Sequence, residues 1–405
     1  MVKAQATFAT GREEVLDLSL PDVVRSLERP GAVAVAPGER SNETVYARLT
    51  PESTRVGKWP NSPWIRRRQP DHYFDIFEDD FFSTTHRFIA PTTPIGSMGS
   101  CFATRIAHQL QLWGYYYVLE EDDLPPEIPV AQLASTTYRM APARCGTLFD
   151  TPGMRQVVER AFGSWSPPRV ISRAPDGRIL DPFRTINQAF RTTEEYEEDR
   201  DRHTAALRRA LLKCDVMILT LGLAEAWQFT PTGDYVSIPQ LAQAPALFQR
   251  RRISVEQNLA ELERLFAVYR AHKADIRFIV SVSPVPLNKT FARDHIVVAN
   301  CHSKSVLRVA AEEFVTRHPG TVYYFPAYEA VLHGTQAAWE DDMRHVSPAA
   351  VARVMRLFQR IFLIDQAPLP LAAHAPPFPR RLAGLQSAAR RALRWWRANR
   401  THRRH

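Results

Sequence analysis

The chain has 405 residues, of which 45% are apolar and 23% charged, a composition typical of a soluble globular protein of one or two domains. It has no run of 18 uncharged apolar residues, no secretory signal at the N-terminus, and only four widely spaced cysteines. These features argue against a membrane-spanning helix and a secreted disulfide scaffold, and they favour a reducing cytoplasm.

The formal net charge of +9 is concentrated at one end of the chain. Residues 376–405 hold nine Arg and no acidic residue, whereas the rest of the chain holds 43 basic and 43 acidic residues. Any attraction to an anionic partner therefore belongs to the tail and not to the neutral body.

Residues 1–90 are predicted to form an irregular extension. Pro, Gly and short charged runs interrupt this region, and its one plausible helix is short, near 21–28. Aromatic side chains gather in its second half, and we expect them to pack the extension onto the body: Trp59, Trp64, Tyr73, Phe74, Phe77, Phe81 and Phe82.

Helical and strand patterns alternate from 91 to 365. Apolar periodicity and capping signals predict helices at 101–113, at 201–213, after Ser254, at 303–317 and after Ser347-Pro348. Short apolar runs predict strands at 115–119, 216–221, 276–282 and 321–325. This alternation predicts an α/β domain with a parallel sheet covered on both faces, whose site lies at the carboxyl ends of the strands. A surface hairpin is expected within 168–184.

A glycine-punctuated turn follows the start of this domain, in the sequence Pro-Ile-Gly-Ser-Met-Gly-Ser-Cys-Phe-Ala at 94–103. Gly96 and Gly99 allow the backbone to bend sharply and keep bulk away from a reacting atom. The Ser100 hydroxyl and the Cys101 thiol are both candidate nucleophiles. We expect the following helix to lower the pKa of the thiol. The alternative is that Cys101 is a small buried packing residue.

Far downstream, Asp342 and His345 are spaced three residues apart just before the last predicted helix. Imidazole titrates near neutrality, and a neighbouring carboxylate fixes its tautomer and stabilises its cation. An isolated pair of this spacing is usually solvated surface, but its position before the helix favours a catalytic role. Together with the early nucleophile, the pair predicts an acyl-transfer site.

The chain resembles the GSCFA family, which is grouped with the SGNH (GDSL-type) hydrolases, from 94 to 362. The resemblance is carried by five segments in the expected order: 99–103, 222–225, 283–285, 300–304 and 342–345. It implies a flavodoxin-like three-layer α/β sandwich. SGNH enzymes carry a Gly-Asp-Ser turn, so the resemblance places Cys101 at the nucleophile position and Ser100 at the aspartate position. It also implies that His345 is the general base and that Asp342 orients it.

The second of these segments departs from the SGNH pattern. It reads Gly222-Leu-Ala-Glu, without the Asn whose amide helps to bind the oxyanion in SGNH relatives. The candidates to replace this donor are the backbone N–H of Cys101, the backbone of Gly146 and the side chain of Asn300. Glu225 is either a second carboxylate in the site or a structural residue at a helix start.

Three more polar residues are candidates for the substrate site. Ser283, followed by Pro284, is expected to shape a loop that faces the substrate. His302 and Lys304 are expected to begin a helix, where they either bind an anionic substrate group or contribute capping and surface charge. No histidines show convergent ligand spacing, so we expect neither a metal ion nor a cofactor.

The resemblance implies ester hydrolysis or acyl transfer on an acylated or acylatable glycan or lipid-linked sugar. The missing Asn supports a second hypothesis, a non-catalytic protein that binds glycan on the same scaffold. A third hypothesis is a glycan-assembly factor that acts at a membrane surface through its tail.

The tail, 366–405, begins with a Pro- and Ala-rich linker. Beyond the linker, apolar residues fall on one helical face among arginines: Leu382, Leu385, Ala389, Leu393 and Trp396. A basic amphipathic helix at 380–404 would lie on an anionic membrane, at the inner surface of the cytoplasmic membrane. The alternatives are a disordered, solvated tail and, least favoured, binding to nucleic acid.

Overall fold

The computed structural model describes residues 4–7, 13–16, 86–122, 127–129, 138–168, 172–173, 176–186, 189–237, 245–334 and 338–364. The chain divides into two compact units, Met1–Tyr73 and Phe74–His405. In the first unit, β1 (Ala4–Thr7) and β2 (Glu13–Leu16) form an antiparallel pair. The expected helix near 21–28, the aromatic cluster of the extension and the basic tail lie outside the described residues.

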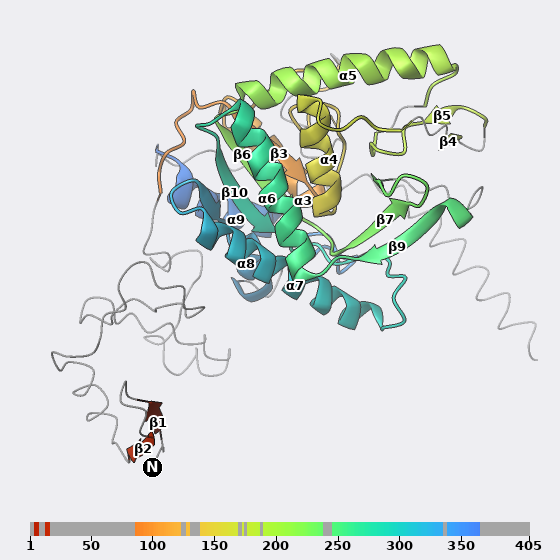
Figure 1. The fold of residues 1–405 in the computed structure, drawn as a ribbon. Helices are drawn as coiled ribbons and strands as arrows, with labels where there is room; N and C mark the ends of the chain where they lie inside the picture. Colours follow the sequence, from red (N-terminus) through yellow and green to blue (C-terminus); the bar gives the residue numbers. More distant parts are fainter. Residues whose placement is uncertain are drawn as a thin grey trace, which may run out of the picture. The chain divides into compact units, whose positions relative to one another are not determined.

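The second unit is built around a parallel four-stranded sheet in the order β11-β10-β6-β3 (Figure 1). Its strands are β3 (Ile95–Gly99), β6 (Val216–Leu221), β10 (Arg277–Val282) and β11 (Val322–Tyr324). All three neighbouring pairs are parallel, which confirms the predicted sheet type. Because the strands run the same way, their carboxyl ends share one edge of the sheet.

The expected strand at 115–119 is reduced to one parallel bridge between Ile95 and Tyr117. The Ile95 N–H donates to the Tyr116 carbonyl at 2.9 Å, and the Val118 N–H donates to the Ile95 carbonyl at 2.9 Å. This segment lies on the side of β3 away from β6. Counting it as the second element gives the spatial order 2-1-3-4-5, which is the flavodoxin-like order.

Helices cover both faces of this sheet (Figure 1). The first face packs on α3 (Cys101–Leu112), α8 (Ala327–Gly334) and α9 (Pro348–Phe362). The second packs on α4 (Thr151–Phe162), α5 (Thr193–Lys213), α6 (Val255–His272) and α7 (Ile296–Arg317). The strands alternate accordingly: Val216 and Ile218 of β6 join the first core, and Met217 and Leu219 join the second. The three-layer prediction is confirmed.

Capping residues explain where several helices begin. Ser254 and Gln257 form the predicted capping box at the start of α6, and Ser347 caps α9. The helix predicted from 303 instead begins at Ile296, because the His295 side chain accepts from the Val297 N–H and caps α7 earlier. Helix α5 likewise begins before its predicted start, at Thr193. Helix α4 was not predicted.

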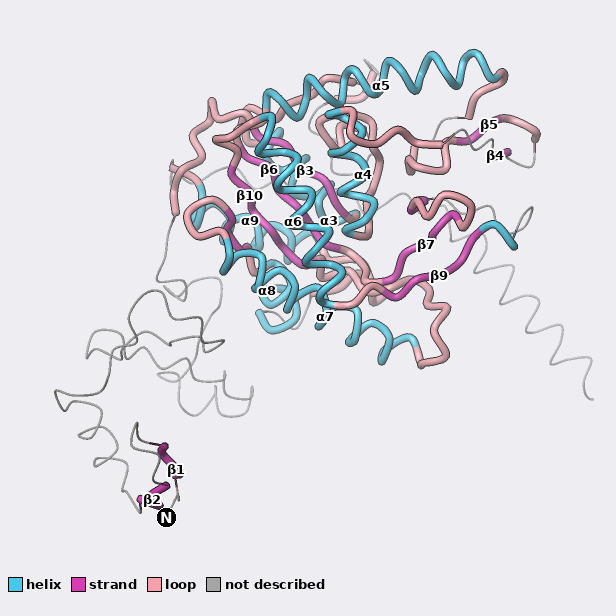
Figure 2. The backbone as a smooth tube through the Cα atoms, in the orientation of Figure 1, coloured by secondary structure: helices cyan, strands magenta, loops and turns pink. Residues whose placement is uncertain are grey.

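A second, antiparallel sheet has the order β8-β7-β9 and extends beside the central sheet (Figure 2). It consists of β7 (Glu225–Phe229), β8 (Tyr235–Val236) and β9 (Phe248–Arg252), and the short 3-10 helix η3 (Pro245–Leu247) precedes β9. The interpretation of Glu225 as a helix-start residue is therefore wrong, because it begins a strand. The expected hairpin within 168–184 is confirmed by β4 (Ser172–Arg173) and β5 (Ile179–Leu180), which pair antiparallel.

Within the part of the chain that the structure describes, no helix is both long enough and apolar enough to cross a bilayer.

Candidate active site

The glycine turn leaves the sheet at the carboxyl end of β3. Gly99 pairs with Thr220 of β6, and a Cβ added at Gly99 would lie 2.4 Å from the Thr220 carbonyl oxygen. The next backbone N–H, that of Ser100, donates to the same carbonyl at 3.2 Å. The turn is thus held against β6 so tightly that residue 99 has no room for a side chain.

Ser100 and Cys101 have different roles in this turn. Ser100 is the N-cap of α3; its side-chain oxygen accepts from the Phe102 N–H at 3.3 Å, and the residue is buried. Cys101 is the first helical residue and is only partly buried. The hydroxyl is therefore engaged in capping, whereas Cys101, at the helix start, is a residue with part of its surface accessible.

Burial raises the pKa of the Cys101 thiol, and the positive charges of Arg344, Lys304 and Arg105 offset part of that rise. The expectation that the helix start would lower this pKa overall is wrong, because desolvation of the thiolate outweighs the favourable electrostatics. A base is consequently needed if the thiol is to react near neutral pH.

The expected pairing of Asp342 with His345 is present. The Asp342 carboxylate contacts Nδ1 of His345 at 2.5 Å, and its other oxygen accepts the backbone N–H of His345 at 2.9 Å and that of Arg344 at 3.0 Å. Burial raises the pKa of Asp342, but these hydrogen bonds outweigh it and hold that pKa below its usual value. The carboxylate is thereby charged and fixed against the ring. The neighbouring Asp341 is exposed.

This acid–imidazole loop packs against the start of α3. Arg105, one turn into the helix, approaches Glu340 at 3.9 Å, and the Glu340 N–H donates to the His345 carbonyl at 2.8 Å. Cys101 also packs on the same apolar cluster as Trp339 and Val346, which flank the loop and bridge to each other. The fold therefore brings the early turn and the late pair together, although more than 200 residues separate them in the sequence.

The loop after β6 uses its amide groups internally. The N–H groups of Gly222 and Leu223 both donate to the Phe149 carbonyl, at 3.0 and 2.7 Å, and the Ala224 N–H donates to the Ser303 hydroxyl at 2.8 Å. Gly222 nevertheless borders the turn, because a Cβ added there would lie 3.3 Å from the Ser100 Cβ. The loop therefore touches the site but presents none of these three donors to it.

Lys304 lies beneath this loop and not at a helix start. Helix α7 begins at Ile296, so His302 and Lys304 both lie inside it, and the expected helix-start position is wrong for both. His302 is exposed, whereas Lys304 is fully buried and donates from Nζ to the Gly222 carbonyl at 2.7 Å. The interpretation of Lys304 as surface charge is also wrong.

Glu225 is held by neighbours outside the turn. It forms an ion pair with Arg250 and accepts from the Thr290 hydroxyl at 3.0 Å. Arg250 in turn lies over the rings of Trp227 and Phe291. Through these contacts the buried carboxylate of Glu225 connects β7 with β9 and with the loop that carries Thr290.

The remaining candidates each contact partners outside the turn. Ser283 is buried and continues the pairing of β10 with β6, since its N–H donates to the Leu221 carbonyl at 2.8 Å. The Asn300 side-chain oxygen accepts from the Leu287 N–H at 3.1 Å. Gly146 packs against Thr185, and a Cβ added to this glycine would lie 2.4 Å from the Thr185 carbonyl oxygen.

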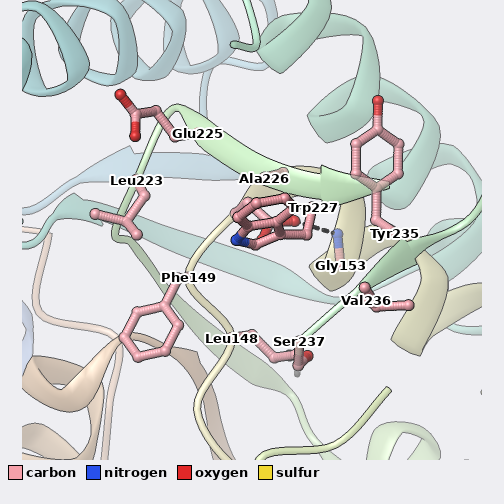
Figure 3. A pocket seen from close by; sticks show the side chains of 11 residues that line it. Leu148, Phe149, Gly153, Leu223, Glu225, Ala226, Trp227, Tyr235, Val236 and Ser237 are labelled. Atoms are coloured by element: carbon pink, nitrogen blue, oxygen red, sulfur yellow. Dashed lines mark hydrogen bonds between the residues drawn. The ribbon is translucent and has the colours of Figure 1, made fainter. Parts of the chain in front are cut away.

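A small pocket of about 70 Å³ opens beside the loop after β6 (Figure 3). It is lined by Leu148, Phe149, Asp150, Gly153, Leu223, Glu225, Ala226, Trp227, Tyr235, Val236 and Ser237, and not by Cys101 or His345. The Glu225 carboxylate points away from the rings of Trp227 and Tyr235, so the interior between them is mainly apolar. The pocket shares Phe149 and Leu223 with the hydrogen bonds that hold the loop after β6.

The GSCFA family model matches residues 94–358. The chain belongs to the GSCFA family. The matched range begins at the residue before β3 and ends within α9, so it covers the whole central sheet and every residue of the candidate site of this GSCFA protein.

Other comparisons add little to the family match. An acetyl esterase mutant with a bound acetate ion shares 12% identity and a TM-score of 0.32, over 67% of this chain and 98% of that one. A carbohydrate esterase family 3 enzyme from Talaromyces cellulolyticus shares 12% identity and a TM-score of 0.29, with the same coverage. Likeness at this level specifies neither a reaction nor a substrate. No curated protein matches the sequence.

Sequence reasoning missed several residues of the site. Arg105 and Arg344 supply positive charge to the thiol, and Phe149 supplies the carbonyl that holds the loop after β6. Arg344 lies inside the Asp-x-x-His segment and could have been noticed there. Phe149 precedes Asp150, the N-cap of α4, and recognising that cap would have placed it at a strand-to-helix loop. Among the described residues, no group of His, Cys, Asp and Glu is arranged to hold a metal ion.

Proposed function

We propose that this GSCFA protein is an esterase or acyltransferase in which Cys101 is the nucleophile, His345 the general base and Asp342 its orienting carboxylate. The observation that carries the proposal is the packing of the Asp342–His345 loop against the first turn of α3, where Cys101 lies. This packing supports the proposal, because acyl transfer requires a nucleophile, a base and an orienting carboxylate close to one another.

The proposed reaction follows from this geometry. His345 takes the thiol proton through Nε2, while Asp342 holds Nδ1 and stabilises the imidazolium. The sulfur attacks the ester carbonyl carbon, the tetrahedral intermediate expels the alkoxide, and the imidazolium returns the proton to that leaving oxygen. Water or an acceptor hydroxyl then attacks the thioester, His345 takes its proton, and the Cys101 thiol leaves reprotonated.

Cys101 is preferred to Ser100 because the two side chains are differently occupied. The Ser100 oxygen caps α3 by accepting from Phe102, and the residue is buried. The Cys101 backbone N–H, at the first position of the helix, remains a candidate oxyanion donor. Gly146 and Asn300 remain weaker candidates, since their described contacts are with Thr185 and Leu287.

For the substrate, we propose an acylated or acylatable glycan or lipid-linked sugar. The pocket beside the loop after β6 supports a small group next to the site, with the rings of Trp227 and Tyr235 as its walls. This part of the proposal is tested by incubating the protein with acetylated oligosaccharides and following acetate release, or acetyl gain when a donor ester is supplied. Turnover of aryl esters with no action on any acetylated sugar would restrict the proposal to the reaction type.

The nucleophile and base are tested with purified full-length protein on a short aryl ester. We expect Cys101→Ala and His345→Ala to lower kcat/KM by about 10²–10⁴-fold, because each removes a group that acts in the transition state. Ser100→Ala should retain more activity than either. Cys301→Ala, at an exposed cysteine, is the matched control for Cys101→Ala. Asp341→Asn, at the neighbouring exposed carboxylate, is the matched control for Asp342→Asn.

An acyl adduct on the Cys101 peptide, found by mass spectrometry after a rapid quench, would identify the intermediate directly. If the wild-type protein and all variants hydrolyse the ester at the background rate and no adduct forms, the enzyme proposal fails. One observation favours the alternative, a glycan-binding protein without catalysis: the amides of the loop after β6 are all satisfied internally. Saturable glycan binding without turnover would support that alternative.

The basic tail supports a further proposal, that residues 380–404 bind an anionic membrane surface. Co-sedimentation with vesicles containing phosphatidylglycerol should fall when 376–405 are deleted, and unchanged pelleting would reject the proposal. Competition by duplex DNA would instead favour nucleic acid as the partner.

A further inference from the structure

Lys304 is a buried cation with few described partners to stabilise its charge. Its side chain is fully buried, and its one described hydrogen bond goes to the Gly222 carbonyl at 2.7 Å. An ammonium group can donate three hydrogen bonds, and buried lysines are normally paired with a carboxylate. Among the described residues, the ionisable group that favours its charge is the Cys101 thiol. The described interactions of this buried ammonium group are thus the hydrogen bond to the Gly222 carbonyl and the influence of the Cys101 thiol on its charge.

The position of Lys304 is set by two elements on opposite sides of the sheet. It projects from α7, which covers the second face, while Cys101 starts α3, which covers the first. Both residues belong to the carboxyl edge of the sheet, because Cys101 follows β3 closely and Lys304 bonds to the loop after β6. Gly222, whose carbonyl accepts the hydrogen bond from Lys304, is also the residue that borders Ser100. The Lys304 ammonium therefore bonds to the same residue of the loop that borders the turn.

The same loop lacks the donor that its SGNH relatives are expected to use. Ala224 stands where those relatives carry the Asn, and the backbone N–H groups of Gly222, Leu223 and Ala224 are all bonded within the protein. A fixed positive charge stabilises a nearby anion strongly when both lie in the low-dielectric interior of a protein, because water does not screen their attraction. The ammonium that bonds to this loop therefore brings a positive charge to the segment from which the amide is missing.

We propose that Lys304 is a positioning residue whose buried ammonium stabilises the Cys101 thiolate. The proposal rests on the assignment of Cys101 as nucleophile in the proposed function. The thiol proton leaves to His345, and the remaining negative charge on sulfur is balanced by Lys304, so no other reactant is needed. Arg105 from α3 and Arg344 from the Asp342–His345 loop also face the thiol, and they are the other charges that influence it.

Alkylation of Cys101 measures thiolate formation without any substrate. Full-length protein is treated with iodoacetamide from pH 7 to 11.5, and carbamidomethylation of the Cys101 peptide is followed by mass spectrometry. Lys304→Met should move the midpoint of this profile upward by about one pH unit and slow alkylation at pH 7 by about tenfold. The exposed Cys301 gives an internal standard, and its profile should not change.

The matched control is Ser303→Ala, next to Lys304 on the same helix. It removes the hydroxyl that accepts from the Ala224 N–H, so it disturbs the same loop while the ammonium stays. Its Cys101 profile should match the wild-type midpoint, as should that of Lys304→Arg, which keeps a positive charge. A midpoint in Lys304→Met equal to or below that of the wild type, with Cys301 unchanged, would overturn the proposal. So would an upward shift of equal size in Ser303→Ala.

If Lys304→Met does not fold, Lys304→Gln takes its place, since it keeps a donor for the Gly222 carbonyl but no charge. The readout separates this inference from the proposed function. A protein without ester turnover can still show the shifted profile, which would support Lys304 and reject only the reaction. A protein with full ester turnover and an unshifted profile would reject Lys304 alone.

Discussion

Two buried cations of this protein, Arg184 and Lys304, are compensated in opposite ways. Arg184 is almost fully buried between two carboxylates; its Nε donates to Asp181 at 2.7 Å, and one terminal nitrogen donates to Asp199. Burial lowers the pKa of Arg184, but the two carboxylates outweigh it and raise that pKa overall. For Lys304, burial lowers the pKa to about 7, and the Cys101 thiol is the group that opposes it.

The difference indicates which cation serves the fold and which serves the site. Arg184 serves the fold, because removing a buried cation with two carboxylate partners leaves those carboxylates buried without that partner. The buried ammonium of Lys304, with only a carbonyl and a thiol as its described partners, lowers the stability of the fold. Its place at the edge of the proposed site is consistent with a functional role, because shifted pKa values cluster at functional sites. Three predictions test this contrast, beginning with the largest expected effect.

Replacing Arg184 by Met should destabilise the protein by about 3–5 kcal/mol, because Asp181 and Asp199 would stay buried without their central partner. Urea denaturation followed by circular dichroism measures this loss. The exposed Arg178, paired with Asp176 at the surface, provides the control, and Arg178→Met should leave the free energy of unfolding nearly unchanged. If Arg184→Met and Arg178→Met changed the free energy of unfolding by similarly small amounts, Arg184 would not be needed for stability.

Replacing Lys304 by Met should stabilise the protein near pH 7, by about 1–3 kcal/mol, since it removes an uncompensated buried ammonium at the expense of one hydrogen bond. The pKa of Lys304 is lower in the folded protein, at about 7, than in the unfolded chain. Between pH 7 and about 10.4 the unfolded chain therefore binds more protons, and the stability of the wild type rises with pH.

The gap between the two proteins should narrow accordingly as pH rises from 7 to 9. Thermal unfolding at intervals of half a pH unit measures it. A variant less stable than the wild type at pH 7, or a gap that widens with pH, would contradict the view of Lys304 as a functional cation kept at a cost in stability.

Replacing Ser303 by Ala should have the smallest effect of the three, a loss of about 1–2 kcal/mol from the unpaired Ala224 N–H. No titratable group is removed, so the loss should be the same at pH 7 and pH 9. A loss of stability that changes with pH would mean that the Ser303 contact, and not the Lys304 ammonium, causes the pH dependence of stability.

The sequence predicted the parts of the fold that depend on neighbouring residues. Six consecutive residues from Val216 to Leu221 form β6 with both predicted ends, because a strand buried on both faces needs a continuous apolar run. The Ser254–Gln257 box and the Asp342–His345 pair are also local, since three residues bring the interacting groups together. These contacts need no knowledge of the rest of the chain.

Other features depend on distant partners and were not predictable in this way. Lys304 is buried because the face of α7 that carries it turns toward the loop after β6, and a lysine in a helix is ordinarily assigned to solvent. Glu225 begins a strand because β9 pairs with it, which the local pattern does not reveal. The sign of the shift in the Cys101 pKa depended on the depth of burial, which only the assembled fold determines.

The tight contact between Gly99 and the Thr220 carbonyl has a consequence for how such motifs are compared. The glycine that opens Gly-Ser-Cys-Phe-Ala is required by the backbone of β6 and not by chemistry at the turn. A protein that replaced the serine or the thiol would still need that glycine as long as the two strands kept their separation. The glycine of the motif is therefore set by the spacing of the sheet and the serine by the helix cap, so that the proposed chemistry depends on the cysteine.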